Sequence, residues 1–181
     1  MSLKSRVECL AEYGSDYMIQ QKIEAGELFK VGKAIYSEKQ HVPEIAVIAY
    51  RYPHAVVTMR SAFYIYGLTD TIPETYDFAT ERDAAKIRDK RVKQFFSPEG
   101  FFDQGKEKIE YKGYPLSIYS RERMLIELLR NKTRIPYDYY KEVLLNYRKQ
   151  ISRLNMQEIQ DYSYEAPKNR KIMELLQTEV L

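Results

Sequence analysis

The stretch from residue 15 to residue 36, SDYMIQQKIEAGELFKVGKAIY, constrains the fold more than any other part of the chain. Its first half predicts a short helix. Ser15 and Asp16 can each cap the start of that helix, because a short side-chain oxygen accepts from the free N–H groups of a first turn. Met18, Ile19 and Ile23 are expected to form one apolar face at helical spacing. Gly26 suits the left-handed backbone that ends many helices, so the helix is expected to end there.

The second half of this stretch predicts a tight β-hairpin. Two short strands, at about 28–31 and 34–36, flank Gly32 and Lys33. Because Gly stands at the first central position, the sequence favours a type II′ turn. A short helix followed by a hairpin with a basic tip is typical of the second half of a winged helix-turn-helix.

The segment before residue 15 predicts the first helix of that arrangement. Its apolar residues recur at the spacing of one helical stripe, and they are Leu3, Val7, Leu10 and Ala11. Gly14 ends this helix, and the next begins at once. Two short helices joined by a turn that contains glycine form a helix-turn-helix, whose second helix enters the major groove of DNA.

The polar side chains of the second helix and of the hairpin are therefore candidates for DNA contact. Gln can read adenine through two hydrogen bonds, Tyr can reach a phosphate, and Lys can neutralise phosphates. The residues that this hypothesis assigns to DNA binding are Ser15, Tyr17, Gln20, Gln21, Lys30 and Lys33. A helix and hairpin that only pack on a larger domain, with these side chains solvated, remain an equal alternative.

Composition places few limits on the function. The 181 residues are 44% hydrophobic and 30% charged, and the net charge of +3 is compatible with nucleic acid binding without requiring it. No apolar run reaches the roughly 20 residues of a membrane span, and the first residues lack the apolar core of a signal peptide. The single cysteine, Cys9, excludes an internal disulfide and is interpreted as a passenger on the first helix. These features predict a cytoplasmic protein that does not associate with membranes.

The rest of the chain predicts mixed structure. Helices are expected at about 43–52 and 58–66, followed by several short strands between 76 and 119. From Ser120 onward apolar residues recur at helical spacing, which predicts a helical C-terminal third. The expected fold class is α+β, with a winged helix-turn-helix at 1–40 and an α+β domain with a helical end at 41–181.

One segment, 81–93, is strongly charged. Arg88, Lys90 and Arg91 within it could contact phosphates of a nucleic acid. The alternative is a solvated loop, which is the more common role of such a run and the one we favour.

Three sequence blocks resemble the AbiEi-type antitoxins of type IV toxin–antitoxin systems, and they occur in the order found in that family. The hairpin block GELFKVGKAIYS is similar to the family's G-E-L-x-R-x-x-x-G-x-Y. A second block follows the pattern S-A-x-x-x-h-G-L-x-x-x-x-P through Ser61, Ala62, Gly67, Leu68 and Pro73. A third is similar to P-h-x-h-x-S-x-E-R-T-h-h-D-L through Pro115, Ser120, Glu122, Arg123, Leu125 and Leu128. The AbiGi phage-resistance proteins share this general design.

The resemblance implies a DNA-binding transcriptional regulator and antitoxin of an abortive-infection, or phage-defence, system. Such a protein represses its own operon by binding operator DNA upstream of it, with possible self-association along the DNA. The linked gene would encode a nucleotidyltransferase-like toxin that forms no stable direct complex with the antitoxin. No cofactor and no metal are implied.

The sequence does not favour an enzyme. H-x-E, P-loop, G-x-G-x-x-G and G-x-S-x-G motifs are all missing, and so is the Gly-Ser and Asp-x-Asp pattern of a nucleotidyltransferase. Asp70, Glu74 and Asp77 are close enough in sequence to suggest a magnesium site, although turn chemistry explains the first two. The alternatives to a DNA-binding regulator are therefore a protein-binding module with a non-DNA-binding winged helix and, less favoured, a nucleotidyltransferase-like enzyme.

Overall fold

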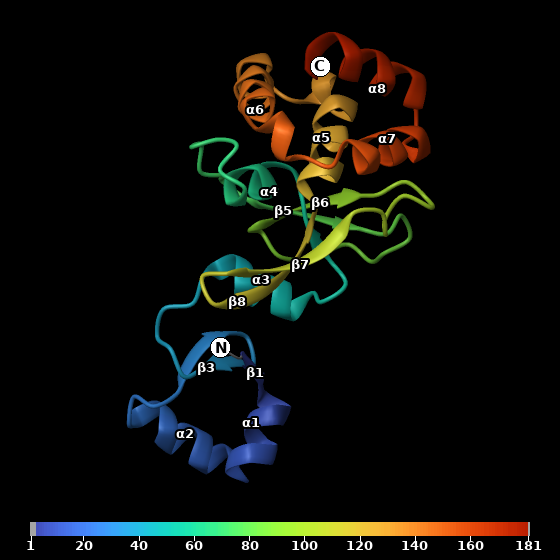
Figure 1. Ribbon diagram of the computed structural model, residues 1–181. Coiled ribbons are helices and arrows are strands. Elements are labelled where there is room, and N and C mark those ends of the chain that lie inside the picture. The colour runs from blue at the N-terminus through green and yellow to red at the C-terminus, as the bar shows by residue number, and fades with distance from the viewer. Residues whose placement is uncertain (1–2, 181) are drawn as a thin grey trace. The chain divides into compact units, whose positions relative to one another are not determined.

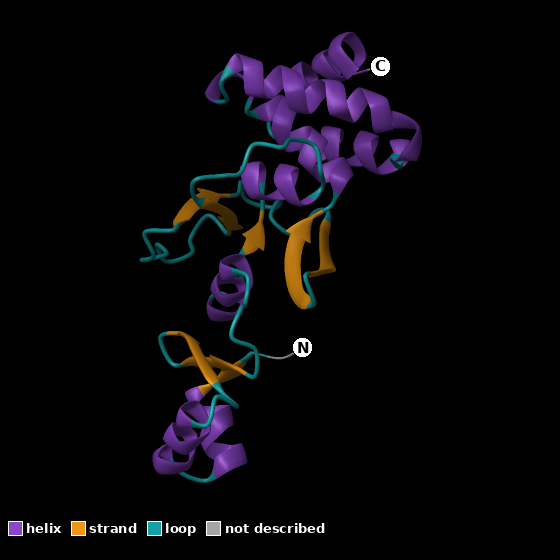
Figure 2. Cartoon of the chain, turned by 90° about the vertical axis from the view of Figure 1, so that its left-hand side faces the viewer, coloured by secondary structure: helices purple, strands orange, loops and turns teal. Residues whose placement is uncertain are grey.

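The computed structural model describes residues 3–180 and confirms the expected α+β class (Figures 1 and 2). The chain forms two compact units. Unit 1 comprises residues 1–53 and 109–116, and unit 2 comprises 54–108 and 117–181. The sequence analysis divides the chain after residue 40, whereas the contacts place the helix that follows residue 43 in unit 1. Within residues 3–180, no helix combines the length and the apolar character that a membrane crossing requires.

Unit 1 alternates short helices with a small antiparallel sheet. The sheet has the order β1-β3-β2, so the strand that precedes the helix pair is hydrogen-bonded to the second strand of the hairpin. The elements are β1 (Lys4–Ser5), α1 (Arg6–Tyr13), α2 (Asp16–Glu24), β2 (Phe29–Gly32), β3 (Ile35–Ser37) and α3 (Glu44–Arg51).

Helix α1 begins later than the apolar stripe predicted. Ser5 caps it, and a capping box forms because Ser5 accepts from the backbone of Glu8 while the Glu8 carboxylate accepts from the backbone of Ser5. Leu3 therefore precedes the helix, and Val7 points to solvent with 75% of its surface exposed. Leu3 is nevertheless buried, with 8% of its surface exposed, so it contributes to the core from outside the helix. The expectation of one helical stripe that runs through both residues is therefore wrong. Gly14 ends α1 in the left-handed conformation, as expected.

The core of the helix pair includes the cysteine. Cys9 is fully buried together with Ile19, Leu28 and Tyr36, and Leu10, Tyr13 and Ile23 pack around them. Burial raises the pKa of the Cys9 thiol, which keeps it protonated and unreactive. Cys9 is thus a core residue of α1, and its interpretation as a passenger is wrong.

The hairpin turn differs from the expected type II′ turn. Gly32 lies within β2 beside a register shift and has no positive φ, whereas Ala34 takes the left-handed conformation with φ of 58°. A Cβ atom at residue 32 would lie 3.0 Å from Cγ1 of Val47 on α3. Glycine is therefore favoured here by the close approach of a helix rather than by the turn.

Helix α3 packs against the rest of unit 1. Besides the contact at Gly32, the hydroxyl of Tyr50 on α3 donates to the Glu8 carboxylate on α1. Ile45, Ala46, Val47 and Ile48 of this helix are buried. The hairpin thus has a close apolar neighbour, and α1 a hydrogen-bonded one, in the next segment of the chain.

Unit 2 combines strands of a mixed sheet with a group of helices. The five-stranded sheet has the order β6-β5-β4-β8-β7, in which β5 pairs with β6 and β4 with β8 in parallel while β4 and β5 are antiparallel. The strands are β4 (Val56–Val57), β5 (Tyr76–Thr80), β6 (Val92–Phe96), β7 (Lys106–Tyr111) and β8 (Tyr114–Tyr119). The tip of the β7–β8 hairpin, 109–116, groups with unit 1.

The helices of unit 2 gather mainly in the C-terminal third, around α5 (Figure 1). Residues 123–129 of α5 are all buried, and α6, α7 and α8 each contact this helix. The bounds are α4 (Met59–Ile65), α5 (Arg121–Arg130), α6 (Tyr137–Gln150), α7 (Met156–Glu165) and α8 (Asn169–Leu175), followed by a π-helical turn at Leu176–Val180.

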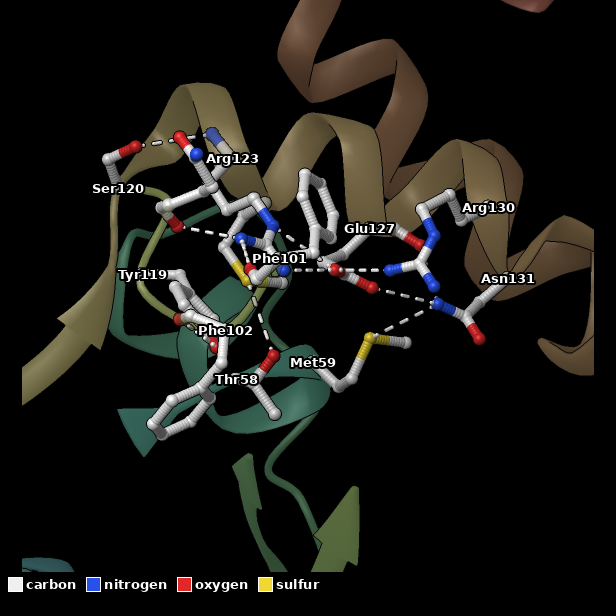
Figure 3. A network of polar contacts seen from close by, with 12 residues as sticks. Thr58, Met59, Phe101, Phe102, Tyr119, Ser120, Arg123, Glu127, Arg130 and Asn131 are labelled. Atoms are coloured by element: carbon white, nitrogen blue, oxygen red, sulfur yellow. Dashed lines mark hydrogen bonds and ion pairs between the residues drawn. The ribbon is translucent and has the colours of Figure 1, made fainter. Parts of the chain in front are cut away.

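A buried arginine holds α5 against the loop between β6 and β7 (Figure 3). Arg123 is 0% exposed, and its guanidinium donates to the carbonyl oxygens of Phe101 (2.6 Å) and Gln104 (2.7 Å). It also donates to Oε1 of Glu127 at 2.8 and 3.1 Å. The ring of Phe101 lies 3.5 Å from the guanidinium carbon.

The same glutamate connects Arg123 to the end of α5. Glu127 accepts from Arg130 through Oε1 (2.6 Å) and from the side-chain amide of Asn131 through Oε2 (3.2 Å). The Asn131 amide also contacts the sulfur of Met59 on α4 (Figure 3). Two arginines share the Glu127 carboxylate, and the hydrogen bonds of this network offset part of the cost of removing its charges from water.

Candidate nucleic-acid interface

The exposed face of α2 carries the polar residues that sequence analysis assigned to DNA reading. Tyr17, Gln20, Gln21 and Glu24 share one face, because they are spaced by three or four residues. Tyr17 is 70% exposed. The amide of Gln20 donates to Glu24 at 3.0 Å, whereas Gln21 forms no side-chain hydrogen bond within residues 3–180. Of the two glutamines, Gln21 therefore has both its donors and its acceptor available.

Ser15 has a structural role at the start of this face. Its Oγ accepts from the backbone N–H of Met18 at 3.3 Å, which caps α2 as expected. The capping oxygen still carries a hydroxyl proton that can be donated to an external acceptor. Ser15 therefore positions the helix start and could contact an anion there at the same time.

An ion pair between the two helices fixes their relative orientation. Arg6, the first residue of α1, donates to Asp16, the first residue of α2, through two bonds of 3.0 and 2.5 Å. Sequence analysis missed this pair, because no spacing rule connects two residues across a helix and a turn. It also missed the start of α1, although the S-x-x-E pattern of Ser5 and Glu8 is a signal for it that can be read from the sequence.

The lysines of the hairpin are available for contact with an anion. Lys30 on β2 and Lys33 in the turn are both exposed, and neither forms an ion pair within the described part of the chain. The same holds for Lys39, which follows β3 and was not identified from the sequence. These three cations lie on or directly after the hairpin, and none of them is on α1 or α2.

The charges of unit 1 balance. Residues 1–53 contain seven Lys and Arg against seven Asp and Glu, and the segment 109–116 contains one of each sign. Several acids are already engaged. Lys4 pairs with Glu12 and Glu38, and Lys22 pairs with Glu27. Of the five basic residues of unit 1 without an ion pair in the described chain, three lie at the hairpin, and the other two are Arg51 at the end of α3 and Lys112 at the tip of the β7–β8 hairpin.

The carboxylate of Glu8 is the most strongly perturbed acid of unit 1. The Tyr50 hydroxyl and the backbone and side chain of Ser5 donate to it, and these bonds lower its pKa to about 2. Its negative charge is therefore stabilised locally across the whole physiological pH range.

The charged segment before β6 lies in unit 2 and is not uniform. Arg88 and Lys90 are exposed, and no ion pair involves them within residues 3–180. Arg91 instead makes a two-bond contact with Asp89, at 3.1 and 2.8 Å. Of the three proposed phosphate contacts, Arg88 and Lys90 thus remain the accessible ones.

The three acids considered as magnesium ligands differ in how exposed they are to solvent. Asp70 and Glu74 are exposed, whereas Asp77 on β5 is buried. Within the described residues, no three side chains of His, Cys, Asp or Glu are grouped so that they could hold a metal ion. Two exposed acids of a polar turn and one buried acid of a strand do not form a common site.

The fold is similar to that of a solved structure. It is the crystal structure of the RV2827C protein from Mycobacterium tuberculosis, which superposes with a TM-score of 0.67 at 11% sequence identity. The similarity covers 98% of this chain and 72% of that one. At this identity the similarity concerns the fold alone, and it extends over both compact units.

Sequence comparison identifies no family. No protein-family model matches the chain, and no curated protein matches it either. The function is therefore argued from the residues themselves.

Proposed function

We propose that the protein is a DNA-binding transcriptional autorepressor that reads its operator with α2 and holds the DNA backbone with its hairpin. One observation carries the proposal: an exposed helix face with Tyr17 and a free Gln21 precedes a hairpin whose Lys30 and Lys33 have no ion-pair partner. In a helix-turn-helix, the N-terminal residues of the second helix contact base edges. Tyr17 stands in the first turn of α2, and Gln20 and Gln21 follow on the same face in the middle of the helix.

The connectivity of unit 1 supports this assignment. Strand β1 precedes the two helices and pairs with β3, so the hairpin is tied to the start of α1 through the sheet. The elements follow one another as a strand, two helices and a hairpin that pairs with the strand. This is the order of a winged helix that lacks its first helix. The Arg6–Asp16 pair and the shared core around Cys9 hold the helix pair in one orientation.

The antitoxin assignment rests on the resemblance to the AbiEi-type family. In that proposal unit 2 carries the antitoxic activity, the toxin is encoded by the linked gene without forming a stable complex, and the protein acts in the cytoplasm. Several residues that carry the resemblance build unit 2: the Ser61 hydroxyl accepts from the backbone of Asp77, and Arg123 forms the buried network. These residues have structural roles in unit 2, and no catalytic role is proposed for them.

A second candidate function is a protein-binding module, and the charge balance of unit 1 favours it. A surface with no net charge gains less from counterion release than the basic surfaces of typical DNA-binding domains. In this alternative the exposed face of α2 contacts a protein, and Lys30 and Lys33 are solvated.

Measuring binding of the full chain to the DNA upstream of its own gene separates the two candidates. A fluorescence anisotropy titration at several salt concentrations should give tighter binding to this DNA than to a shuffled sequence of the same composition. The affinity should fall with salt, because lysines that contact phosphates release counterions. Equal binding to both sequences, or no binding at low salt, would leave the protein-binding module as the better assignment.

A further inference from the structure

Unit 2 contains a small cavity whose lining is polar at one end and apolar at the other. It has a volume of about 210 Å³ and lies between α4, β5, β6 and the segment that joins α5 to α6. Asp77 and the aromatic residues Phe63, Phe95 and Tyr139 line it, together with Met59, Asn131 and Ile135. Three basic side chains, Arg60, Lys93 and Arg134, complete the lining.

The carboxylate in this cavity is buried and incompletely satisfied. Asp77 is 1% exposed, and its Oδ2 accepts from the backbone N–H of Arg60 at 3.0 Å. Its Oδ1 has no hydrogen-bond partner within residues 3–180, and neither has the buried hydroxyl oxygen of Tyr139. A buried polar atom without a partner is costly, and the lining of this cavity contains two of them, which is compatible with a site where a bound molecule adds hydrogen bonds.

The basic side chains of the lining are free to meet an anion. None of Arg60, Lys93 and Arg134 forms an ion pair in the part of the chain that the structure describes. Lys93 and Arg134 are exposed, whereas Arg60 is partly buried, with its guanidinium carbon 5.8 Å from the centre of the Tyr139 ring. The cavity therefore combines a buried acceptor with exposed positive charge.

Residues in the wall of the cavity are held in place by contacts with their surroundings. Asn131 is held by Glu127 of the buried arginine network, and it contacts Met59 through the sulfur (Figure 3). Met59 itself has a φ of 44°, a conformation that is rare for residues other than glycine and that persists only where the surroundings impose it. Both residues line the cavity, so its shape depends on the packing of α4 against α5.

We propose that this cavity binds the base of a guanine nucleotide, with the phosphate of the nucleotide held by Lys93 and Arg134. A guanine base fits a volume of about 210 Å³, whereas a whole nucleotide needs more room, because complete ligand sites usually exceed roughly 300 Å³. The sugar and phosphate therefore extend toward the exposed cations. This inference concerns unit 2 and is independent of DNA binding by unit 1.

The preference for guanine follows from the chemistry of a carboxylate. An ionised carboxylate only accepts hydrogen bonds, and guanine presents its ring N–H and its 2-amino group side by side. Adenine and cytosine each place an acceptor ring nitrogen next to their amino group, and that nitrogen would face Asp77. Burial raises the pKa of Asp77 to about 6, so the carboxylate is mostly ionised at pH 7.5. The Tyr139 hydroxyl can donate to a carbonyl oxygen of the same base.

A second cavity indicates where further phosphates could lie. It has a volume of about 230 Å³ and shares Asn131 and Arg134 with the first. Lys168 and Lys171, both exposed and without ion pairs in the described chain, also line it. A guanine nucleotide can therefore come from two sources: a free mononucleotide, or the terminal nucleotide of a strand whose next phosphates follow this second cavity.

The test measures binding to the full chain by isothermal titration calorimetry at pH 7.5. Guanosine 5′-monophosphate should bind more tightly than guanosine, inorganic phosphate or the other three nucleoside monophosphates. The variant Arg134→Gln should weaken binding of the monophosphate several-fold and leave guanosine unaffected. Lys141→Gln, on an exposed part of α6 outside both cavities, is the matched control and should change nothing.

A change of specificity distinguishes recognition from a structural role of Asp77. Asp77→Asn adds a donor, which fits the 2-carbonyl group of xanthine and not the 2-amino group of guanine. This variant should bind guanosine 5′-monophosphate roughly tenfold more weakly and gain affinity for xanthosine 5′-monophosphate. A variant that merely lost structure would bind neither nucleotide, and Arg134→Gln then remains as a test on an exposed residue.

The source of the nucleotide is decided by a single-stranded tetranucleotide that ends in guanosine. If the ligand is a strand end, the tetranucleotide should bind more tightly than the mononucleotide, and Lys171→Gln should weaken only the tetranucleotide. If the ligand is free, Lys171→Gln should affect neither. The proposal is overturned if neither molecule binds at millimolar concentration, or if inorganic phosphate binds as tightly as the nucleotide.

Discussion

The two compact units differ in their net charge and in whether their charged side chains are buried. Unit 1 has as many acidic as basic residues, and its ion pairs, such as Arg6 with Asp16, are formed by exposed side chains. Unit 2 carries the whole net charge of +3 and buries charged groups: Arg123 within a satisfied network and Asp77 beside a cavity. In unit 1, therefore, charged residues should influence binding and its salt dependence, whereas in unit 2 they should also determine stability.

The units also differ in how their cores are built. The helix pair and hairpin of unit 1 share a small core around Cys9, whereas α5 of unit 2 is buried along seven consecutive residues. A small core depends strongly on neighbouring segments, because few apolar contacts must offset the conformational entropy of the whole element. The experiments below test these differences, starting with the largest expected effect.

Residues 1–40 expressed alone should be largely unfolded, and extension to residue 53 should restore helical structure. The shorter fragment lacks α3, whose Val47 packs at Gly32 and whose Tyr50 donates to Glu8. Circular dichroism during heating of the two fragments checks this expectation. A cooperative transition in the shorter fragment would show that the helix pair and hairpin form an independent domain.

Arg123→Ala should lower the free energy of unfolding by about 3–5 kcal/mol, as expected when one partner of a buried ion pair is removed. The loss arises because Glu127 and the carbonyl oxygens of Phe101 and Gln104 would stay buried without their donor. Urea denaturation provides the measurement. Arg6→Ala, which removes an exposed ion pair of unit 1, is the control and should have a much smaller effect. Equal losses for both variants would remove the contrast between the units.

Asp77→Asn and Glu8→Gln should change the pH dependence of stability in opposite directions. Burial raises the pKa of Asp77 to about 6, so its contribution is greatest when it is protonated and is lost as pH rises through 6. Relative to Asp77→Asn, the native protein should lose roughly 2–3 kcal/mol between pH 4 and pH 7.5.

For Glu8 the donated hydrogen bonds lower the pKa to about 2, so its stabilising contribution is present above the ordinary pKa of a glutamate and disappears as pH falls toward 2. The native protein should thus lose stability relative to Glu8→Gln in acid. Urea denaturation across the pH range gives both differences, and the same trend for the two variants would contradict the assigned causes.

Gln21→Ala should reduce the ratio of operator affinity to random-DNA affinity. One bidentate contact to a base contributes roughly 1–3 kcal/mol of discrimination, and Gln21 is the glutamine whose amide is free. Gln20→Ala, which removes a side chain already bonded to Glu24, is the matched comparison and should have the smaller effect. If both variants keep the ratio, neither glutamine contributes to reading the sequence.

The smallest expected effect is on the salt dependence of DNA binding. Replacing Lys30 and Lys33 with Gln should weaken binding to all DNA alike and reduce the slope of log affinity against log salt by about one unit for each lost contact. The same replacement of Arg88 and Lys90 tests whether unit 2 also contacts phosphates. If the slope changes only for the first pair, the segment 81–93 is a solvated loop, as its composition favours.

Local structure followed closely from local sequence. Gly14 and Gly26 end their helices in the left-handed conformation, Ser15 and Ser120 cap theirs, and the first of the strands predicted between 76 and 119 is β5 at Tyr76–Thr80. In each case the determining interaction joins residues that are neighbours in the sequence. The same reasoning failed at Gly32, where the reason for glycine lies in a helix fifteen residues away.

Some features of the candidate sites could be predicted from local sequence, and others could not. The exposed face of α2 and the basic hairpin could be predicted, because helical spacing and turn residues determine which side chains point outward. That Lys22 is paired while Lys30 is free could not be predicted, since ion pairs depend on where separate elements meet. The cavity around Asp77 was also beyond prediction, because its lining comes from residues 59 to 139.

The sequence by itself determined the α+β class and several helix ends, such as those at Gly14 and Gly26, because hydrogen bonding and side-chain periodicity act over a few residues. Only the tertiary structure decided that Cys9 and Arg123 are buried, that α3 belongs with the N-terminal helices, and that Asp77 lies beside three free cations. Burial and pairing depend on contacts between distant segments. The helical pattern of the sequence therefore cannot distinguish an arginine that faces solvent from one that, like Arg123, is buried and bonds its helix to a loop.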